Sequence, residues 1–303
     1  MTQITAEVET NGDCWTSVGP AGHGMTEPTG LTVRFWGVRG TIPCPGPGTL
    51  RYGGNTACVE VLCGPARIIF DGGTGLRGLG KQLQASNQPT ASHLFFSHTH
   101  FDHVGGLPFF KPAYDPRNRL ELWGGCLQQQ GSRLEEVLGT LIQRPFFPVP
   151  LGIMHACLAF HDFEVGEVLT PFDGASLHTA PLHHPGGATG YRLECAGRSI
   201  CYITDTEHPE AGRDANVLRL MAGADLVIYD STYTDQEYAG YRGWGHSTWQ
   251  EGVRLCDAAG AKRLVAFHHD PEHDDATLDR IAVELEAACP GSIVAYEGLE
   301  ICL

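Results

Sequence analysis

The chain contains the stretch Leu94-Phe-Phe-Ser-His-Thr-His-Phe-Asp-His-Val-Gly-Gly106, in which four potential metal ligands fall within six residues: His98, His100, Asp102 and His103. An apolar run that ends in a tight loop can turn His98 and His100 toward one point, and the next turn brings Asp102 and His103 to a neighbouring point. Imidazole with carboxylate suits zinc or a similar divalent cation, and two cations about 3.5–4 Å apart are a recurring hydrolytic arrangement. The stretch therefore predicts a metal site at a strand end. The alternative is a solvent-exposed loop rich in histidine.

The rest of the chain predicts a mixed α/β layered fold. Short apolar or β-branched runs separated by glycine-rich turns predict strands at 31–36, 57–62, 66–70, 94–97, 191–194, 199–204, 226–230, 264–268 and 293–296. Helical periodicity predicts helices at 76–85, 128–141, 211–221 and 248–259. No linker divides the chain, so we expect one domain over residues 31–303, preceded by a flexible polar tail at residues 1–30.

Composition excludes several classes of protein. Lys+Arg is 20 and Asp+Glu is 35, and the formal net charge of −15 disfavours a non-specific binder of nucleic acid. The 11 cysteines form no C-x-x-C pair, which predicts free, mostly buried thiols in a reducing compartment. The first residues lack the pattern of a signal peptide, and no apolar run is long enough for a membrane span, so we expect a cytoplasmic protein with no membrane association.

The spacing His98-x-His100-x-Asp102-His103 resembles the signature of the metallo-β-lactamase superfamily. This resemblance implies an αββα four-layer sandwich with a metal site at the edges of the sheets. The segment 66–75, which ends in Asp71-Gly-Gly-Thr-Gly, resembles the strand and turn that precede the histidine signature in the superfamily.

The resemblance also implies the remaining ligands. Members related to ribonuclease Z place the next histidine six residues before a Gly-Tyr pair, which here favours His184, with His183 as the alternative. Asp205 follows an apolar run and matches the metal-bridging aspartate, although an aspartate there can also be a turn residue. His268 ends a late apolar run and is favoured over His269. The implied set gives two divalent cations, with zinc favoured over manganese or iron, and its members fall into three groups: His98, His100 and His184; Asp102, His103 and His268; and Asp205 between the two cations.

Such a centre implies hydrolysis by a metal-bridging hydroxide, with Asp102 counted among the catalytic residues, but it serves thioesters, lactones and phosphodiesters alike. The segment 243–251 around His246 resembles the phosphodiesterase branch typified by ribonuclease Z. In that branch the histidine is expected to stabilise the phosphate or to protonate the leaving group, and Asp230 resembles the acidic residue that orients it.

The substrate expected from the sequence is a small phosphodiester such as a cyclic nucleotide. His184 and Asp205 are only 21 positions apart, which leaves no room for the transfer-RNA arm of ribonuclease Z. The net charge of −15 makes a long nucleic acid an unfavourable partner. A lactonase or thioesterase, ribonuclease Z-like RNA processing, and a catalytically silent sensing module are the alternatives. A homodimer is a family-level expectation.

Overall fold

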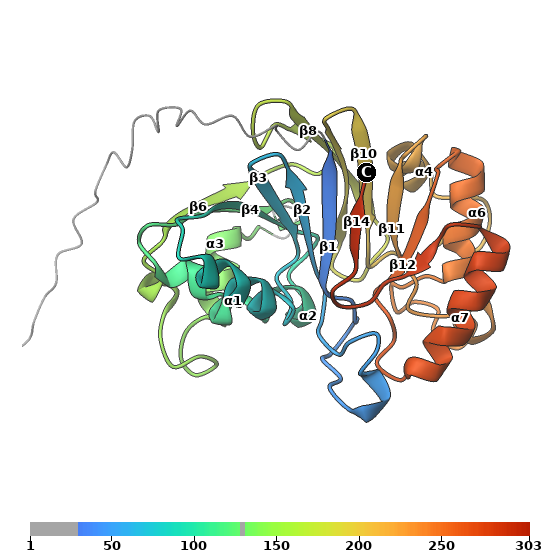
Figure 1. Ribbon diagram of the computed structural model, residues 1–303, viewed down its shortest axis with the longest axis horizontal. Coiled ribbons are helices and arrows are strands. Elements are labelled where there is room, and N and C mark those ends of the chain that lie inside the picture. Colours follow the sequence, from blue (N-terminus) through green and yellow to red (C-terminus); the bar gives the residue numbers. More distant parts are fainter. Residues whose placement is uncertain (1–29, 128–130) are drawn as a thin grey trace, which may run out of the picture.

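The structure is a computed structural model that describes residues 30–127 and 131–303. Two seven-stranded sheets face each other, and helices cover the outer face of each one (Figure 1). The αββα four-layer sandwich expected from the sequence is therefore confirmed. The expected flexible tail lies outside the described residues, apart from residue 30.

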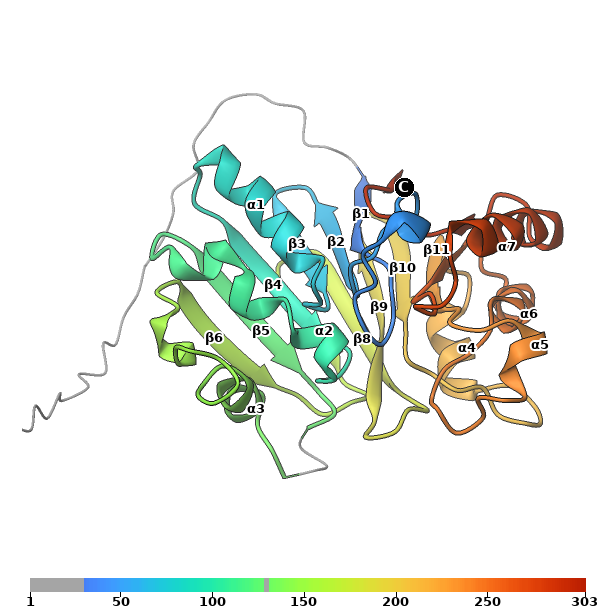
Figure 2. The same ribbon diagram turned by 90° about the horizontal axis from the view of Figure 1, so that it is seen from below.

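The first sheet has the strand order β14-β1-β2-β3-β4-β5-β6. Its strands are β1 (Leu31–Gly37), β2 (Cys58–Cys63), β3 (Ala66–Phe70), β4 (Ala91–Phe96), β5 (Arg119–Gly124), β6 (Cys157–Asp162) and β14 (Glu300–Cys302). The helices between these strands are α1 (Leu76–Ser86), α2 (Phe101–Val104) and α3 (Leu134–Leu141), with the short 3-10 helices η1 (Pro47–Thr49), η2 (Leu107–Phe109), η3 (Lys111–Tyr114) and η5 (Leu151–Ile153). Seen from below, α1 and α3 lie along one face of this sheet (Figure 2).

The second sheet has the strand order β13-β12-β11-β10-β9-β8-β7. Its strands are β7 (Val168–Leu169), β8 (Ala175–Leu182), β9 (Ala188–Cys195), β10 (Arg198–Ile203), β11 (Leu226–Asp230), β12 (Leu264–Phe267) and β13 (Ile293–Val294). The helices that follow its strands are α4 (Ala215–Met221), α5 (Asp235–Tyr238), α6 (Trp249–Ala259) and α7 (Asp275–Ala288).

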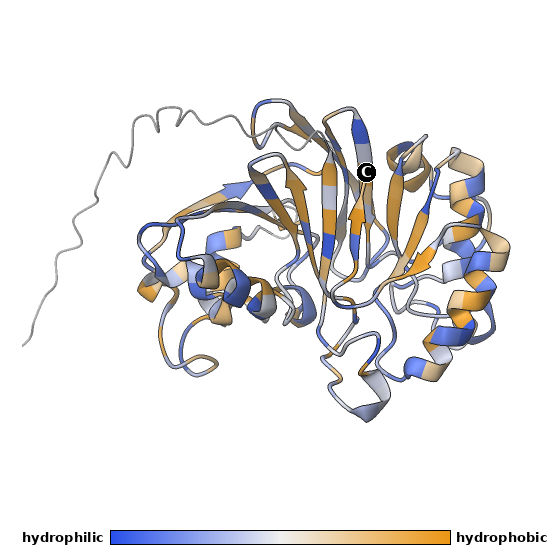
Figure 3. Cartoon of the chain, viewed as in Figure 1, coloured by the Kyte–Doolittle hydropathy of each residue, from blue (hydrophilic) through white to orange (hydrophobic). Residues whose placement is uncertain are grey.

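The main core lies between the sheets. In β1 burial alternates along the strand, so that Val33 and Phe35 face the second sheet, where Phe35 lies 6.0 Å from Phe267 of β12 between ring centroids. Each sheet buries its other face under its helices: on α1, for example, Leu76, Leu79 and Leu83 are buried, at the spacing of one helical face. Many strands of both sheets are rich in hydrophobic residues, whereas hydrophobic and hydrophilic residues alternate along helices such as α7 (Figure 3).

The topology brings the carboxyl ends of several strands to one edge of the sandwich. β3, β4 and β5 run parallel in one sheet, and β10, β11 and β12 run parallel in the other. Side chains that follow parallel strands of a sheet meet at the same edge. At this edge the backbone of Asp71, Asp205 and His268 has a positive φ, of 59°, 56° and 63°. Residues other than glycine adopt this conformation at a cost of order 1 kcal/mol or more, and it is concentrated at functional sites.

Most predicted strands are present within one to three residues of their expected bounds. The helix predicted at 128–141 begins at Leu134, and the first three residues of the predicted range lie outside the described residues. The helix predicted at 211–221 begins at Ala215, because the side chain of Asp214 caps it. Helix α6 is capped by Thr248, whose side chain accepts a hydrogen bond from the backbone N–H of Glu251. The strands β5 to β8 and the helix α7 have no counterpart in the prediction.

The expectation of free thiols is wrong for two cysteines. Cys63 at the end of β2 and Cys195 at the end of β9 form a disulfide that joins the two sheets, with 6.7 Å between their Cα atoms. Their separation of 132 residues leaves no local sequence signal, because only the packing of the sheets brings them together. The other cysteines in the described residues are unpaired. Among the helices of residues 30–127 and 131–303, none combines the length and apolar character that crossing a bilayer requires.

Candidate metal centre

The seven predicted ligands come from separate elements and meet at one edge of the sandwich. His98 and His100 lie in the loop after β4, Asp102 and His103 lie on α2, and the other three follow β8, β10 and β12. The structure therefore brings together all seven residues, His98, His100, Asp102, His103, His184, Asp205 and His268, in two adjoining groups.

The first group is formed by three histidines. Nε2 of His184 lies 3.1 Å from Nδ1 of His100, and the imidazole of His98 lies beside both. Nε2 of His98 is buried and has no hydrogen-bond partner among the described residues. A buried polar atom without a partner is costly, and a cation that accepts its lone pair removes that cost.

The second group contains Asp102, His103 and His268. Nε2 of His103 lies 3.1 Å from a carboxylate oxygen of Asp102 and 3.3 Å from Nε2 of His268. The backbone N–H of Thr41 donates a hydrogen bond of 2.7 Å to Asp102, which holds this carboxylate in place.

Asp205 lies between the groups and turns one oxygen to each. Its Oδ1 lies 3.9 Å from Nε2 of His98 and 3.8 Å from Nε2 of His184. Its Oδ2 lies 3.2 Å from Nε2 of both His103 and His268. A carboxylate in this position can give one oxygen to each of two cations.

Two hydrogen bonds set the tautomers in the second group. Nδ1 of His103 lies 2.8 Å from Oδ2 of Asp71, and because a carboxylate only accepts, this contact keeps a proton on Nδ1. Nε2 faces the carboxylates of Asp102 and Asp205, where a cation would take the place of its proton. Nδ1 of His268 lies 3.1 Å from the hydroxyl of Thr232, which itself donates to Asp230. The hydroxyl therefore accepts from His268, whose Nε2 is also free to bind a cation.

The first group is arranged in the same way. Nδ1 of His184 donates to the carbonyl oxygen of Gly245 at 2.8 Å. Nδ1 of His98 lies 3.1 Å from the hydroxyl of Ser97, which donates its own proton to Asp71. Burial lowers the pKa of both His98 and His184, so both imidazoles are neutral near pH 7 and can act as metal ligands.

Asp71 was missing from the predicted site, although its Asp-x-Gly turn was recognised. Its side chain is fully buried and accepts hydrogen bonds from Ser97, from His103 and from the hydroxyl of Tyr202, the last at 2.7 Å. It thus orients a histidine of each group, directly for His103 and through Ser97 for His98. Such partners raise metal affinity by fixing ring orientation and tautomer.

His246 and Asp230 form a buried pair beside the cluster. Nδ1 of His246 lies 3.0 Å from Oδ2 of Asp230 and 3.8 Å from Oδ1 of Asp205. Burial alone lowers the pKa of His246, but the carboxylates of Asp230, Asp205 and Asp102 together outweigh it and raise this pKa to about 9. The hydrogen bond places one proton on Nδ1, so Nε2 carries the second proton of the imidazolium.

Glu207 is a second residue that the sequence analysis missed. Its carboxylate accepts hydrogen bonds from the backbone N–H groups of Gly243, at 2.8 Å, and Gly245, at 3.0 Å. This loop carries His246, and the carbonyl of Gly245 binds His184. Glu207 therefore positions His184 and His246 together. No local pattern marks it, because its partners are more than 30 residues away.

The alternative histidines lie outside the cluster. The side chain of His183 is 73% exposed and lies 3.8 Å from Asp214. His269 is buried, and its Nε2 lies 2.8 Å from the carbonyl oxygen of Ala295; burial lowers its pKa to about 3. Arg39 is also fully buried, and its guanidinium binds backbone carbonyls in the neighbouring loops.

A cavity of about 370 Å³ opens beside the first group. His184 forms part of its wall, together with His183, Pro185, Glu207, His208, Pro209, Glu210, Gly243 and Gly245. Its lining contains two carboxylates and no Lys or Arg side chain. Trp244, between two of the lining residues, is 62% exposed.

Comparison with known proteins places this arrangement in a family. Residues 66–269 match the model of the beta-lactamase superfamily domain. A ribonuclease Z of Gemmatimonas aurantiaca is 36% identical over 321 residues, which cover 89% of this chain and 95% of that protein. The metallo-beta-lactamase fold protein YhfI from Bacillus subtilis has a TM-score of 0.66 at 18% identity, over 90% of this chain and all of that one. A diphosphatase from the PhnP family has a TM-score of 0.64 at 18% identity, over 90% of this chain and 97% of that one.

The chain belongs to the beta-lactamase superfamily, as its histidine signature indicated. Within it, the chain is a metal-dependent hydrolase related to ribonuclease Z.

Proposed function

We propose that the protein is a dinuclear phosphodiesterase that hydrolyses a small phosphodiester such as a cyclic nucleotide. The observation that carries the proposal is the buried pair of His246 and Asp230 against a cluster in which Asp205 divides its two oxygens between two sets of histidines. Hydrolysis of a thioester or a lactone would also use this cluster. A protonated imidazole beside it is of greatest use when an alkoxide leaves from phosphorus.

The chemistry of the donor set fits two divalent cations. One would be held by His98, His100 and His184, the other by Asp102, His103 and His268, with Asp205 shared. For His184 and His103 the outer ring nitrogen is held by a hydrogen bond, which leaves the inner ring nitrogen facing the centre of its group. Zinc suits a site rich in imidazole, and manganese or iron is an alternative. Such cations would polarise a phosphoryl oxygen and lower the pKa of a water between them.

His246 would supply the proton that the leaving oxygen needs. The hydrogen bond from Nδ1 to Asp230 keeps the imidazolium oriented, and among the described residues Nε2 has no hydrogen-bond partner. The carboxylate of Asp230 also accepts from the backbone N–H of Ser247, at 3.3 Å, and from Thr232. These hydrogen bonds hold the Asp230 carboxylate in place, and with it the imidazole of His246. The imidazolium can therefore donate its proton from Nε2 without a rearrangement of the loop.

The size and charge of the adjoining cavity support a small substrate. Its volume of about 370 Å³ is near the lower end of the range for small-molecule sites. Of its two carboxylates, Glu207 accepts backbone hydrogen bonds and Glu210 pairs with Arg242, and no Lys or Arg among the lining residues is available to a strand with many phosphates. Between His184 and Asp205 the chain contains only β9 and β10 with their turns, so it has no protruding arm there.

Ribonuclease Z-like processing of RNA is the second candidate, because a relative that is 36% identical carries that name. A panel of substrates separates the candidates. It contains a 2′,3′-cyclic nucleotide, bis(p-nitrophenyl) phosphate, a precursor transfer RNA, a lactone and a thioester, with metal analysis of the same preparation. We expect turnover of the first two. Preference for the precursor RNA would establish the second candidate, and preference for the lactone or thioester would refute both.

The role of His246 is tested by comparing two phosphodiesters that differ in their leaving group. His246→Ala should slow an alkyl phosphodiester by about 10²–10⁴-fold, the range for general acid catalysis, and a p-nitrophenyl ester much less, since nitrophenolate leaves without a proton. His183→Ala is the matched control, because this adjacent histidine lies outside the cluster. Equal losses on both esters with full metal content would assign His246 to charge stabilisation of the phosphate instead.

A further inference from the structure

A second, cationic pocket lies apart from the metal centre, between α1 and the segment of η2 and η3. Its volume is about 280 Å³, and we call it the α1 pocket. It is lined by Arg77 and Lys81 of α1, by Pro108 and Phe109 of η2, and by Lys111 and Tyr114 of η3. None of the seven predicted ligands lines it.

The cations of this pocket are unpaired. Most Lys and Arg side chains of the protein bind carboxylates or backbone carbonyls. Those in the described residues that have neither an ion pair nor a side-chain hydrogen bond are Arg77, Lys81, Lys111, Arg144, Arg213 and Arg219. Three of them line this one pocket, in a protein with a net charge of −15.

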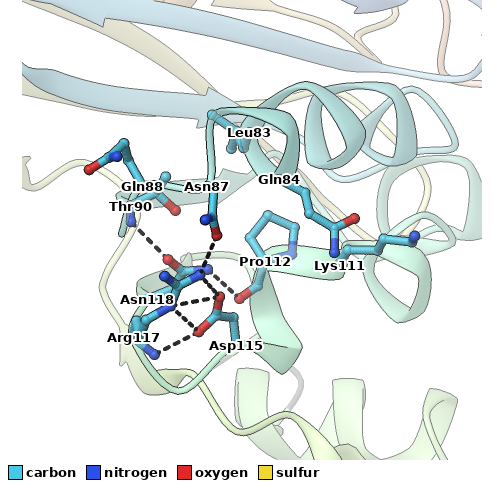
Figure 4. A pocket seen from close by; sticks show the side chains of 10 residues that line it. All are labelled: Leu83, Gln84, Asn87, Gln88, Thr90, Lys111, Pro112, Asp115, Arg117 and Asn118. Atoms are coloured by element: carbon cyan, nitrogen blue, oxygen red, sulfur yellow. Dashed lines mark hydrogen bonds and ion pairs between the residues drawn. The ribbon is translucent and has the colours of Figure 1, made fainter.

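Their arrangement is unfavourable without an anion. Arg77 and Lys81 are four residues apart on α1, where like charges lie on one face and repel each other. η3 packs against α1 near Gly80, which brings Lys111 to the same pocket. No carboxylate is among the lining residues. Lys111 also borders a neighbouring pocket, drawn in Figure 4, where its side chain points away from Asp115, whose carboxylate pairs with Arg117 at 2.7 Å.

The pocket also has an aromatic wall. Phe109 is 54% exposed, although its ring centroid lies 5.8 Å from that of Phe147 in an edge-on contact. Tyr114 is held beside it, because its hydroxyl donates to the carbonyl oxygen of Pro108 at 2.6 Å. An exposed aromatic face next to unpaired cations is the combination that binds a base together with its phosphate.

We propose that the α1 pocket binds a nucleotide through its phosphate and its base, separately from the metal centre. The size of the pocket matches one nucleotide rather than a strand, and the ligand would offset the repulsion among the three cations. Two sources present this chemistry, a free nucleotide or the end of an RNA strand. The inference does not depend on the proposed phosphodiesterase activity, because it uses none of the residues of the metal centre.

The test is the binding of AMP, adenosine and a labelled five-residue oligoadenylate RNA to the purified protein. Binding is measured for wild type, for R77Q/K81Q/K111Q and for R144Q/R213Q/R219Q. The last variant is the matched control, since it removes the same charge from unpaired cations that do not line the pocket. We expect at least a tenfold loss of AMP affinity in the first variant and less than a twofold loss in the control. F109A should also weaken AMP binding, by about fivefold or more, because stacking is lost.

The outcomes separate the possibilities. AMP binding that matches or exceeds that of the oligonucleotide identifies a free nucleotide as the ligand. Tighter oligonucleotide binding, with a salt dependence that R77Q/K81Q/K111Q reduces, identifies a strand end. The proposal is overturned if wild type binds none of the probes, if adenosine binds as well as AMP, if both triple variants lose affinity equally, or if chelation alone abolishes AMP binding. Turnover of bis(p-nitrophenyl) phosphate should be unchanged in R77Q/K81Q/K111Q, so failure of the pocket and failure of the proposed activity are distinguishable.

Discussion

Replacing Asp230 with Asn should change how the activity depends on pH. Burial lowers the pKa of His246, and the nearby carboxylates more than compensate, raising it from 6.5 to about 9. At about 1.4 kcal/mol per pKa unit, this difference corresponds to about 3 kcal/mol in favour of the imidazolium. Among the carboxylates, Asp230 contributes most, because it bonds Nδ1 of His246 directly at 3.0 Å.

The sign follows from the role of His246 as a proton donor. The imidazolium is the active form, so the rate falls as pH rises through its pKa. Asp230→Asn keeps the side-chain shape but removes the charge, and the alkaline limb should move down by about two to two and a half pH units. If the pKa falls to about 6.5–7, the imidazolium fraction at pH 8 drops roughly ten- to thirtyfold, whereas at pH 6 the fractions differ by less than about twofold.

The assay is the pH–rate profile on an alkyl phosphodiester, with metal content checked at each pH. Asp225→Asn is the matched control, because Asp225 lies at the opposite end of β11 and pairs with Lys262 at 2.7 Å. Its profile should overlay that of wild type. If the rates of Asp230→Asn are lower than those of wild type by the same factor at every pH, and its alkaline limb keeps the wild-type position, proton donation by His246 is refuted.

Three further predictions concern the metals. Asp71→Asn should weaken metal binding by about 10–100-fold, measured by competition with a chelating dye, because it disturbs the orientation of His103; unchanged affinity would contradict this role. Gly40→Ala should lower metal content and activity together, since its new methyl group would collide with the ring of His268, whereas Gly48→Ala, whose methyl group would have only an ordinary contact at 3.6 Å, should match wild type. Chelation should lower the midpoint of thermal unfolding by several degrees, because cations that bind only the folded state stabilise it by about 2.7 kcal/mol at a hundredfold excess over Kd. Addition of zinc or manganese should restore the midpoint. A midpoint that chelation leaves unchanged would argue against occupied metal sites.

The predicted ligand residues could be picked out from sequence because most of them closely follow an apolar run that forms a strand. Their chemistry is local: His98 and His100 alternate after β4, and Asp205 and His268 lie one or two residues beyond β10 and β12. The sequence favoured His184 over the adjacent His183, and in the structure His184 lies in the cluster whereas the side chain of His183 is exposed. Strand β6 was missed because it is an edge strand whose residues are all half-buried, so its burial pattern does not alternate.

The sequence alone determined which residues are available for metal chemistry and in what order they follow strands, because periodicity and spacing are local properties. Only the tertiary structure decided which side chains support them. Asp71 reaches His103 across 32 residues, and Glu207 reaches Gly243 across 36, while the disulfide of Cys63 and Cys195 joins opposite sheets. These contacts depend on how the two sheets pack and where their strands end, and no short stretch of sequence encodes that. The same packing gathered the unpaired cations of the α1 pocket from two separate segments.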